Sequence, residues 1–248
     1  MKGELIFGVN PVKESLQGGR GAYNLYVQNN ASDHRAEKII KLAEGRGVAV
    51  HRREKNDLTR MCASSHHQGI ALEVEPFHYA ELDDFLPVSS GQAAAPGLLL
   101  ILDGIQDPHN LGALIRSAAC AGARGVIIPK DRACGVTAAA EKASAGAVEL
   151  IPVVLVTNIA HALERLKSHG YWVYGLENGS SQSLFDTDFS GCVALVVGGE
   201  GEGIRPLVRR QCDVQLSIPL HGGVNSLNVS VAGGIALFDA ARKLRGHV

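Results

Sequence analysis

Short apolar runs alternate with segments of helical spacing over residues 98–248. The apolar runs are residues 98–102, 126–128, 151–156, 171–176, 193–197 and 214–218. Segments such as 158–168 and 203–211 lie between them, and a longer helical segment covers residues 228 to 245 at the end. Apolar strands that alternate with helices are typical of a mostly parallel sheet with both faces covered. We therefore predict an α/β fold for this part of the chain.

The first 75 residues predict a smaller αβ unit. Helices are expected at 10–17, 33–45 and 57–63, and strands at 23–28, 48–51 and 70–74. Residues 76–97 contain Pro76, Pro87 and Pro96 beside Ser, Gly and Ala residues, which is typical of a linker. The predicted organisation is therefore a domain at 1–75, a linker at 76–97 and a second domain at 98–248. In the first domain, His66 and His67 lie in a polar turn and are either exposed or in contact with a substrate.

A polar turn at 107–110 follows the strand at 98–102 and precedes a helix that ends at Gly122. The apolar residues of this helix recur at the spacing of one buried face, and Arg116 falls off that face. The turn carries Asn110 at the carboxyl end of a strand, where open α/β sheets bind ligands. Two interpretations stay open from this stretch alone, a ligand site or a packed unit with a solvated arginine.

The loop Gly198-Gly199-Glu200-Gly201-Glu202-Gly203 directly follows the strand at 193–197. Its glycines allow a ligand to approach the backbone, but their spacing is not that of a dinucleotide fingerprint. Each carboxylate would repel a phosphate charge 4 Å away by about 4 kcal/mol at an effective dielectric of 20. The loop therefore favours an uncharged or cationic ligand such as S-adenosyl-L-methionine over NAD. Glu200 is also expected to pair with Arg116 and orient it.

The loop at 219–230 leads into the final helix. Ser226 and Asn228 lie at the expected helix start. Ser and Asn are ordinary N-cap residues, so these two either cap the helix or contact a ligand.

Composition excludes several classes of protein. Hydrophobic residues make up 46% of the chain and charged residues 20%, which is typical of a globular domain. The apolar runs are far shorter than the roughly 18 residues that cross a bilayer, and no apolar segment follows the first four residues, so we expect a cytoplasmic protein with no membrane partner. The five cysteines have no C-x-x-C spacing, which predicts reduced core thiols and no metal site.

Net charge is −1, which argues against a protein that coats nucleic acid by bulk attraction. The distribution is uneven, because residues 1–62 carry 11 basic and 7 acidic side chains, a net charge of +4. Residues 98–248 carry 13 of each, a net charge of zero. The excess in the first domain is weak support for a polyanionic partner.

Three motifs resemble those of the SpoU (TrmH) family of RNA ribose 2'-O-methyltransferases. They are DPHNLGALIRSA at 107–118, VVGGEGEGI at 196–204 and SIPLHGGVNSLNVSVAGGIALF at 217–238. The segments FGVNPVKESL and HQGIALEV (67–74) resemble the small substrate-binding domain of family members that modify a guanosine in bacterial 23S rRNA. The resemblance covers the whole second domain, and one departure is Asn225, where a small residue is more usual.

The resemblance implies a SPOUT fold with a C-terminal trefoil knot, preceded by a small L30e-like αβ domain. It implies S-adenosyl-L-methionine as cofactor and a homodimer that packs partly through the final helix. The cofactor-binding positions that match the family are Gly198, Ile218 and Leu227, with Thr157, Leu220, Gly199 and Gly203 nearby. The functional positions that match are Asn110, Arg116, Glu200, Ser226 and Asn228.

The same resemblance implies ribose methylation of a guanosine in the peptidyl-transferase region of 23S rRNA during ribosome maturation. Within the family, a tRNA or another rRNA site is the alternative substrate. Arg116 acts either as the base or, because a guanidinium rarely loses its proton, as an electrostatic group that holds RNA phosphate. Outside the family, the alternatives are a dinucleotide oxidoreductase and a non-catalytic RNA-binding factor of ribosome assembly.

Overall fold

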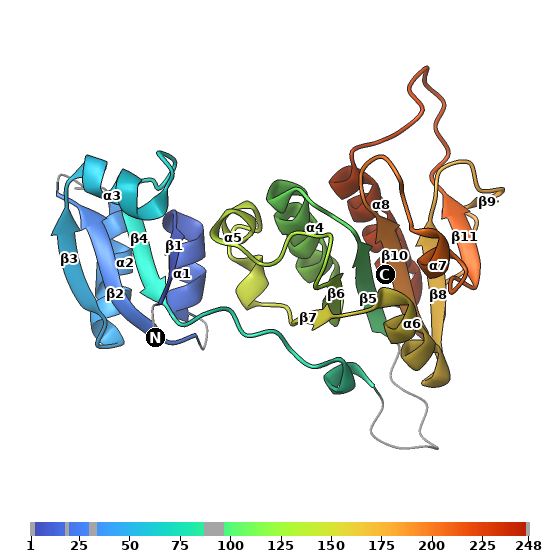
Figure 1. Cartoon of the computed structure of the whole chain (residues 1–248), viewed down its shortest axis with the longest axis horizontal. Helices are drawn as coiled ribbons and strands as arrows, with labels where there is room; N and C mark the ends of the chain where they lie inside the picture. Colours follow the sequence, from blue (N-terminus) through green and yellow to red (C-terminus); the bar gives the residue numbers. More distant parts are fainter. Residues whose placement is uncertain (1–2, 18–19, 30–33, 87–96, 247–248) are drawn as a thin grey trace.

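The computed structural model describes residues 3–17, 20–29, 34–86 and 97–246. It contains a four-stranded sheet, formed by the first part of the chain, and a seven-stranded sheet, formed by the second part. Figure 1 shows the smaller unit in blue and cyan beside the larger one in green to red. Residues 75–86 leave the smaller unit and run along one side of the larger one (Figure 1).

The smaller sheet has the strand order β1-β4-β2-β3. Leu25 and Val27 of β2 point to the face covered by α1 and α2, and Tyr26 between them points to the face covered by α3. This alternation follows from the two-residue period of a strand. The elements of this unit are β1 (Glu4–Phe7), α1 (Val9–Gln17), β2 (Ala22–Gln28), α2 (His34–Gly45), β3 (Ala49–Arg53), α3 (Lys55–Cys62) and β4 (Ile70–Val74).

The larger sheet has the strand order β7-β6-β5-β10-β8-β11-β9, and all its neighbouring strands pair in parallel. Every residue of its central strands β5 and β10 is buried. Its strands are β5 (Gly97–Asp103), β6 (Gly125–Pro129), β7 (Val153–Val156), β8 (Tyr171–Leu176), β9 (Gln182–Ser183), β10 (Cys192–Gly198) and β11 (Val214–Ser217). The predicted mostly parallel α/β sheet is therefore confirmed.

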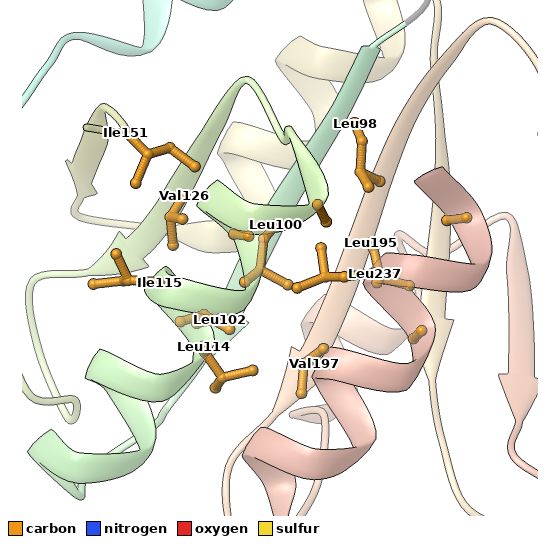
Figure 2. Packing of buried hydrophobic residues seen from close by; sticks show 14 of the residues in the cluster. Leu98, Leu100, Leu102, Leu114, Ile115, Val126, Ile151, Leu195, Val197 and Leu237 are labelled. Atoms are coloured by element: carbon orange, nitrogen blue, oxygen red, sulfur yellow. The ribbon is translucent and has the colours of Figure 1, made fainter. Parts of the chain in front are cut away.

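Helices cover both faces of the larger sheet. Leu98, Leu100 and Leu102 of β5 pack on one face against α4 and α8, and Leu99 and Ile101 pack on the other face with α6 and α7. Figure 2 shows the first of these clusters between α4 and α8. The helices are α4 (Pro108–Ala121), α5 (Ala138–Ala143), η2 (Ala147–Glu149), α6 (Ile159–Ser168), α7 (Pro206–Arg209) and α8 (Val229–Leu244).

Several elements differ from the sequence prediction. β1, α5, η2 and β9 were not expected, and the helix predicted over 203–211 is shortened to α7. The described part of the predicted linker is packed, because η1 (Leu82–Phe85) buries Leu82 and Phe85 against the larger sheet. Residues 87–96 of that linker lie outside the described residues. The trefoil knot stays a prediction.

The five cysteines are all free thiols, but Cys120 is exposed on α4 rather than in the core. Over the described ranges, no helix is long and apolar enough to cross a membrane. Those same ranges contain no group of three or more His, Cys, Asp or Glu residues arranged to hold a metal ion.

Candidate active site

The carboxyl ends of β5, β10 and β8 lie side by side in the larger sheet. Gly198 at the end of β10 pairs with Asp103 of β5, and Val197 pairs with Leu176 of β8. A cavity of about 460 Å³ opens beyond β10 and β8, against the start of α8. The residues that line it are Leu176, Glu177, Asn178, Val197, Gly198, Gly199, Glu200, Gly201, Gly203, Ile218, Leu220, Ser226, Leu227, Asn228, Val229 and Ala232.

The loop after β10 packs closely on its own backbone. A Cβ atom at Gly198 would lie 2.1 Å from the carbonyl carbon of Gly203, and one at Gly199 would lie 2.4 Å from the backbone oxygen of Gly104. Gly201 has a φ of 89°, a conformation that favours glycine. The glycines at 198 and 199 are therefore needed for the loop to fold, and the loop offers the cavity mainly backbone atoms.

Asp103 and Arg205 fix this loop to the end of β5. The carboxylate of Asp103 accepts hydrogen bonds from the backbone N–H of Arg205 (2.8 Å) and from its Nε (2.7 Å). The side chain of Asp103 is fully buried, and its backbone oxygen accepts from the N–H of Gly199 (2.9 Å). A buried carboxylate that is paired and hydrogen-bonded on both sides holds its partners in one geometry.

A chain of side-chain hydrogen bonds connects the three loops. The amide of Asn228 donates to Oδ1 of Asn110 (3.2 Å), and the amide of Asn110 donates to the carboxylate of Glu200. Oδ1 of Asn228 accepts from the backbone N–H of Ser230 (2.9 Å), so Asn228 is the N-cap of α8. Asn228 therefore fills both roles that the sequence left open, and Ser226 is not the cap.

Most of the predicted site residues meet at this cavity. Gly198, Gly199, Gly203, Ile218, Leu220 and Leu227 line it, as do Glu200, Ser226 and Asn228. Asn110 does not line it but is bonded to two residues that do.

Two predicted residues lie elsewhere. Arg116 is exposed on α4 and makes no hydrogen bond or ion pair with the described residues, so its expected pairing with Glu200 is wrong in this structure. Glu200 contacts Asn110 instead. Thr157 lines a separate cavity of about 560 Å³ between the end of β7 and α7. The structure thus places Thr157 outside the 460 Å³ cavity that the other predicted cofactor-binding residues line.

Sequence reasoning missed Glu177 and Asn178, which line the cavity at the end of β8. Glu177 forms an ion pair with Arg209, yet its Oε2 atom is buried with no hydrogen-bond partner. The signal was present, because an acidic residue and an amide directly follow a predicted parallel strand, and such strands place ligands beyond their carboxyl ends.

The cavity is acidic. Its lining contains the carboxylate of Glu200, the carboxylate of Glu177, which is already ion-paired with Arg209, and no lysine or arginine. A ligand with a positive charge is therefore favoured there over a phosphate-bearing one.

The two histidines of the turn at 66–67 have different environments, because His66 is exposed and His67 is buried. His67 is buried, its Nδ1 accepts from the N–H of Gly69 (3.0 Å), and its Nε2 lies 3.1 Å from the hydroxyl of Thr59. Burial, together with the nearby Lys55 and Lys142, lowers the pKa of His67 and favours the neutral ring. His67 therefore holds this turn, and only His66 is available to a substrate.

Known sequences match both units of the chain. The SpoU rRNA Methylase family matches residues 97–238, which is more than half of the sequence. The chain belongs to this family. A second family, described as RNA 2'-O ribose methyltransferase substrate binding, matches residues 5–80.

Relatives of this family member match nearly the full chain. The 23S rRNA (guanosine-2'-O-)-methyltransferase RlmB of Ralstonia nicotianae is 41% identical over 98% of this chain and 96% of its own length. The putative TrmH family tRNA/rRNA methyltransferase YacO of Bacillus subtilis is 39% identical over 97% of this chain and 96% of its own.

Solved structures show the same fold. An AdoMet-bound rRNA methyltransferase from Sinorhizobium meliloti covers 98% of this chain and 88% of its own, with a TM-score of 0.81 and 24% identity. The SpoU methyltransferase AviRb from Streptomyces viridochromogenes, in complex with AdoMet, covers 96% and 89%, with a TM-score of 0.79 and 24% identity.

Proposed function

We propose that this SpoU family member methylates the ribose 2'-hydroxyl of a guanosine in 23S rRNA, with S-adenosyl-L-methionine as the methyl donor. The observation that carries the proposal is the acidic, glycine-walled cavity beyond β10 and β8, which lacks basic side chains. Two relatives whose names state this reaction match 98% of the chain at 41% and 42% identity. A substrate in ribosomal RNA also implies a place of action in the cytoplasm, where bacterial ribosomes are assembled.

The residues of the cavity fit this cofactor. The unpartnered Oε2 of Glu177 and the carboxylate of Glu200 are suited to its positive charges. The closely packed Gly198 and Gly199 leave backbone groups, rather than side chains, to face the adenosine. Ile218, Leu220 and Leu227 supply the apolar wall on which an adenine ring can rest. Ser226 and Asn228 are placed to orient the methionine end or the target ribose.

When bound, S-adenosyl-L-methionine supplies a methyl group on a sulfonium, which a ribose oxygen can displace. The residues of the chain have to position that oxygen and stabilise the charge that forms as its proton leaves. Asn110 is held between Asn228 and Glu200, and the second N–H of its amide is left to donate to a substrate oxygen at this edge of the sheet.

Arg116 serves this reaction as a cation rather than as a base. Its guanidinium has a pKa that makes the neutral form rare. It lies six positions after Asn110 on α4, about 9 Å along the helix axis, and points to solvent outside the cavity. That position suits a group that holds an RNA phosphate as the target nucleotide enters.

The chain is proposed to act as a homodimer through α8 and the neighbouring face of α4. Val231 and Phe238 of α8 are about half exposed, at 50% and 52%. Gly234 of α8 lies against Ser117 of α4, so the two helices present one continuous surface. Exposed apolar side chains gathered on one helix favour association with a second copy.

A dimer of this kind predicts a simple variant. Phe238→Glu places a charge at the centre of the proposed interface, and sedimentation velocity should show a monomer where the unmodified chain is a dimer. A control variant, Leu207→Glu, changes an exposed apolar residue of α7, which packs on the opposite face of the sheet from α8, and should leave the dimer intact. A dimer that survives Phe238→Glu would contradict the role of α8.

The two units are proposed to divide the work, with RNA recognition in residues 1–75 and methyl transfer in residues 98–248. The match of residues 5–80 to a substrate-binding family supports this division, as does the net charge of +4 over residues 1–62.

The proposal is tested first by calorimetry of the purified chain with S-adenosyl-L-methionine and with NAD. Binding of the first and not of the second is expected. Mapping of 2'-O-methyl groups in 23S rRNA from cells that lack the gene should then show one guanosine unmodified. A lost methyl group in tRNA or at another rRNA position would name a different substrate, and cofactor binding without any lost methyl group would contradict the proposed reaction.

A further inference from the structure

Helix α5 and the adjacent turn η2 belong to the larger unit but contact the smaller one. They lie between α4 and the β1-α1 region in Figure 1. Ala138 at the start of α5 packs with Phe7 and Leu58 of the smaller unit. We call residues 138–149 the seat, because the smaller unit rests on them.

Arg20 of the smaller unit is buried against the seat, with 5% of its side chain exposed. Its Nη1 donates to the carboxylates of Glu141 (2.7 Å) and Glu149 (3.1 Å), both on the seat. Its Nε donates to the backbone oxygen of Glu75 (2.7 Å), and its Nη2 donates to Glu4 (2.5 Å). The guanidinium of Arg20 therefore links the seat to the two ends of the smaller sheet's chain segment, at Glu4, the first residue of β1, and at Glu75, directly after β4.

Other contacts around the seat are close. Nζ of Lys142 donates to the backbone oxygen of His66 (2.5 Å) and lies 5.4 Å from the centre of the Phe7 ring. A Cβ atom at Gly146 would lie 2.4 Å from Cγ of Glu14, so η2 and α1 touch with no space between them. The two units thus meet through packed surfaces and not through Arg20 alone.

The seat is equally close to the helix that carries the candidate active-site residues. A Cβ atom at Gly112 of α4 would lie 2.4 Å from the backbone oxygen of Ala140. Asn110 and Arg116 are on the same helix. A displacement of the smaller unit from the seat would therefore change where that unit holds an RNA relative to these residues.

We propose that Arg20 is a positioning residue for RNA methylation, which fixes the RNA-binding unit on the seat beside α4. The role assigned to each unit rests on the proposed function. The charges explain why the guanidinium is needed, because without it the carboxylates of Glu4, Glu141 and Glu149 would be left together with no cation. Removal of one partner from a buried, hydrogen-bonded charge group leaves the others desolvated and unpaired.

The variant Arg20→Met keeps an unbranched apolar side chain of similar reach and removes the charge. Without the fixed geometry, an RNA held by the smaller unit is no longer delivered to the cavity at a high effective concentration. We expect the KM for RNA to rise about tenfold or more, while kcat at saturating RNA and the Kd of S-adenosyl-L-methionine stay within about twofold. Small-angle X-ray scattering of the free protein should show a larger radius of gyration.

Arg210→Met is the control, because Arg210 is an exposed arginine at the end of α7 in the larger unit. It should change neither the radius of gyration nor the KM for RNA. Lys142→Ala is a milder variant of the seat that removes the bond to His66, and it should raise the KM for RNA in the same direction by a smaller factor. If Arg20→Met folds poorly, the KM of Lys142→Ala for RNA tests the proposal in its place.

An Arg20→Met protein with an unchanged radius and an unchanged KM would overturn the proposal. So would a loss confined to kcat, or a Lys142→Ala protein identical to the unmodified chain. The scattering measurement needs no catalysis, so it tests the position of the units even if the unmodified protein fails to methylate 23S rRNA. Failure of the unmodified protein to methylate 23S rRNA would refute the proposed function and not the role of Arg20.

Discussion

Arg116 matches a functional position of the family, yet within the described part of the chain it makes no side-chain contact that would explain a function. It is exposed, has no partner among the described residues, and does not line the cavity, although its motif matches that of the family. Such a residue has little to do for the fold. We therefore propose that it acts through contacts with the RNA.

We therefore expect Arg116→Ala to reduce kcat by about 100-fold or more, as removal of a positioned charge does. The free energy of unfolding should change by no more than about 0.5 kcal/mol, which is usual for an exposed site. The Kd of S-adenosyl-L-methionine should be unchanged, because the cavity does not include Arg116. Single-turnover methylation, chemical denaturation and calorimetry measure the three quantities.

Arg116→Lys separates two roles, since lysine keeps the charge but lacks the planar fork. Substantial rescue supports simple charge stabilisation, and no rescue supports bidentate phosphate binding. Arg210→Ala, at another exposed arginine of the same unit, is the control. Near-normal methylation by Arg116→Ala would mean that this side chain is only solvated.

At individual residues, a sequence can indicate positions where the backbone itself is closely packed. Gly198 and Gly199 are required by contacts that any Cβ would disrupt, and such glycines are visible in a sequence. The expected pairing of Glu200 with Arg116 was wrong, because the guanidinium of Arg116 and the amide of Asn110 are both suitable partners and only the fold decides between them. Thr157 was assigned to the cofactor site only because it matches a family position. In the structure it lines the second cavity, together with Glu202 and Arg205.

At the scale of elements, the loop 198–205 depends on its tie to β5. Arg205→Ala should weaken the binding of S-adenosyl-L-methionine by about tenfold or more, because it leaves the buried carboxylate of Asp103 without its charged partner. The loop would then no longer be held in one geometry beside the cavity. Calorimetry measures the loss of affinity.

Arg205→Lys should restore only part of this affinity, because an ammonium cannot make the two-point contact of a guanidinium. Arg210→Ala again serves as the control. An Arg205→Ala protein that binds the cofactor normally would show that the glycine packing is sufficient to fix the loop.

Long elements with regular periodicity were predicted nearly to the residue, and β8 (Tyr171–Leu176) has the expected bounds. The missed helix α5 has the sequence AAAEKA, in which small residues give no contrast between an apolar and a polar face. Its position is set by Gly112, which admits the backbone of α5 at close range, and by the contacts with the smaller unit. A period of 3.6 residues cannot reveal a helix whose residues are nearly all small and which packs against two neighbours.

For the whole molecule, the charge cluster at the seat predicts a dependence of stability on pH. Burial raises the pKa of Glu141 from 4.5 to about 7, against the opposing effect of Arg20 and with the support of Glu4 and Glu149. The folded chain then keeps a proton that the unfolded chain loses, so the free energy of unfolding falls as pH rises between about 4.5 and 7. The slope from this group reaches at most about 1.4 kcal/mol per pH unit.

Glu141→Gln should remove this contribution. Urea denaturation at several pH values between 5 and 9 should show the unmodified chain losing stability relative to the variant as pH rises through about 7. The difference should become constant above about pH 8, where Glu141 is ionised in both the folded and the unfolded chain. Parallel stability curves for the two proteins would contradict a proton held by Glu141.

A second prediction at this scale concerns the division into units. A fragment from Leu98 was the natural choice from the sequence, but it would lack Leu82 and Phe85, which are buried in the larger unit. The fragment 76–248 retains them and should fold, dimerise and bind S-adenosyl-L-methionine. Its affinity for 23S rRNA should fall by about tenfold or more, because the basic first unit is missing. Undiminished methylation by this fragment would contradict the assigned role of residues 1–75.

The position of β10 also has a consequence for how the protein is made. Cys192 to Gly198 pair with Gly97 to Asp103 on one side and with β8 on the other, so the central strand of the sheet is synthesised long after β5. Until that strand has left the ribosome, a nascent chain carries two apolar strands with open edges, which are prone to pair with other chains. A chain that stops before residue 192 is therefore a substrate for chaperones and proteases rather than a shortened methyltransferase.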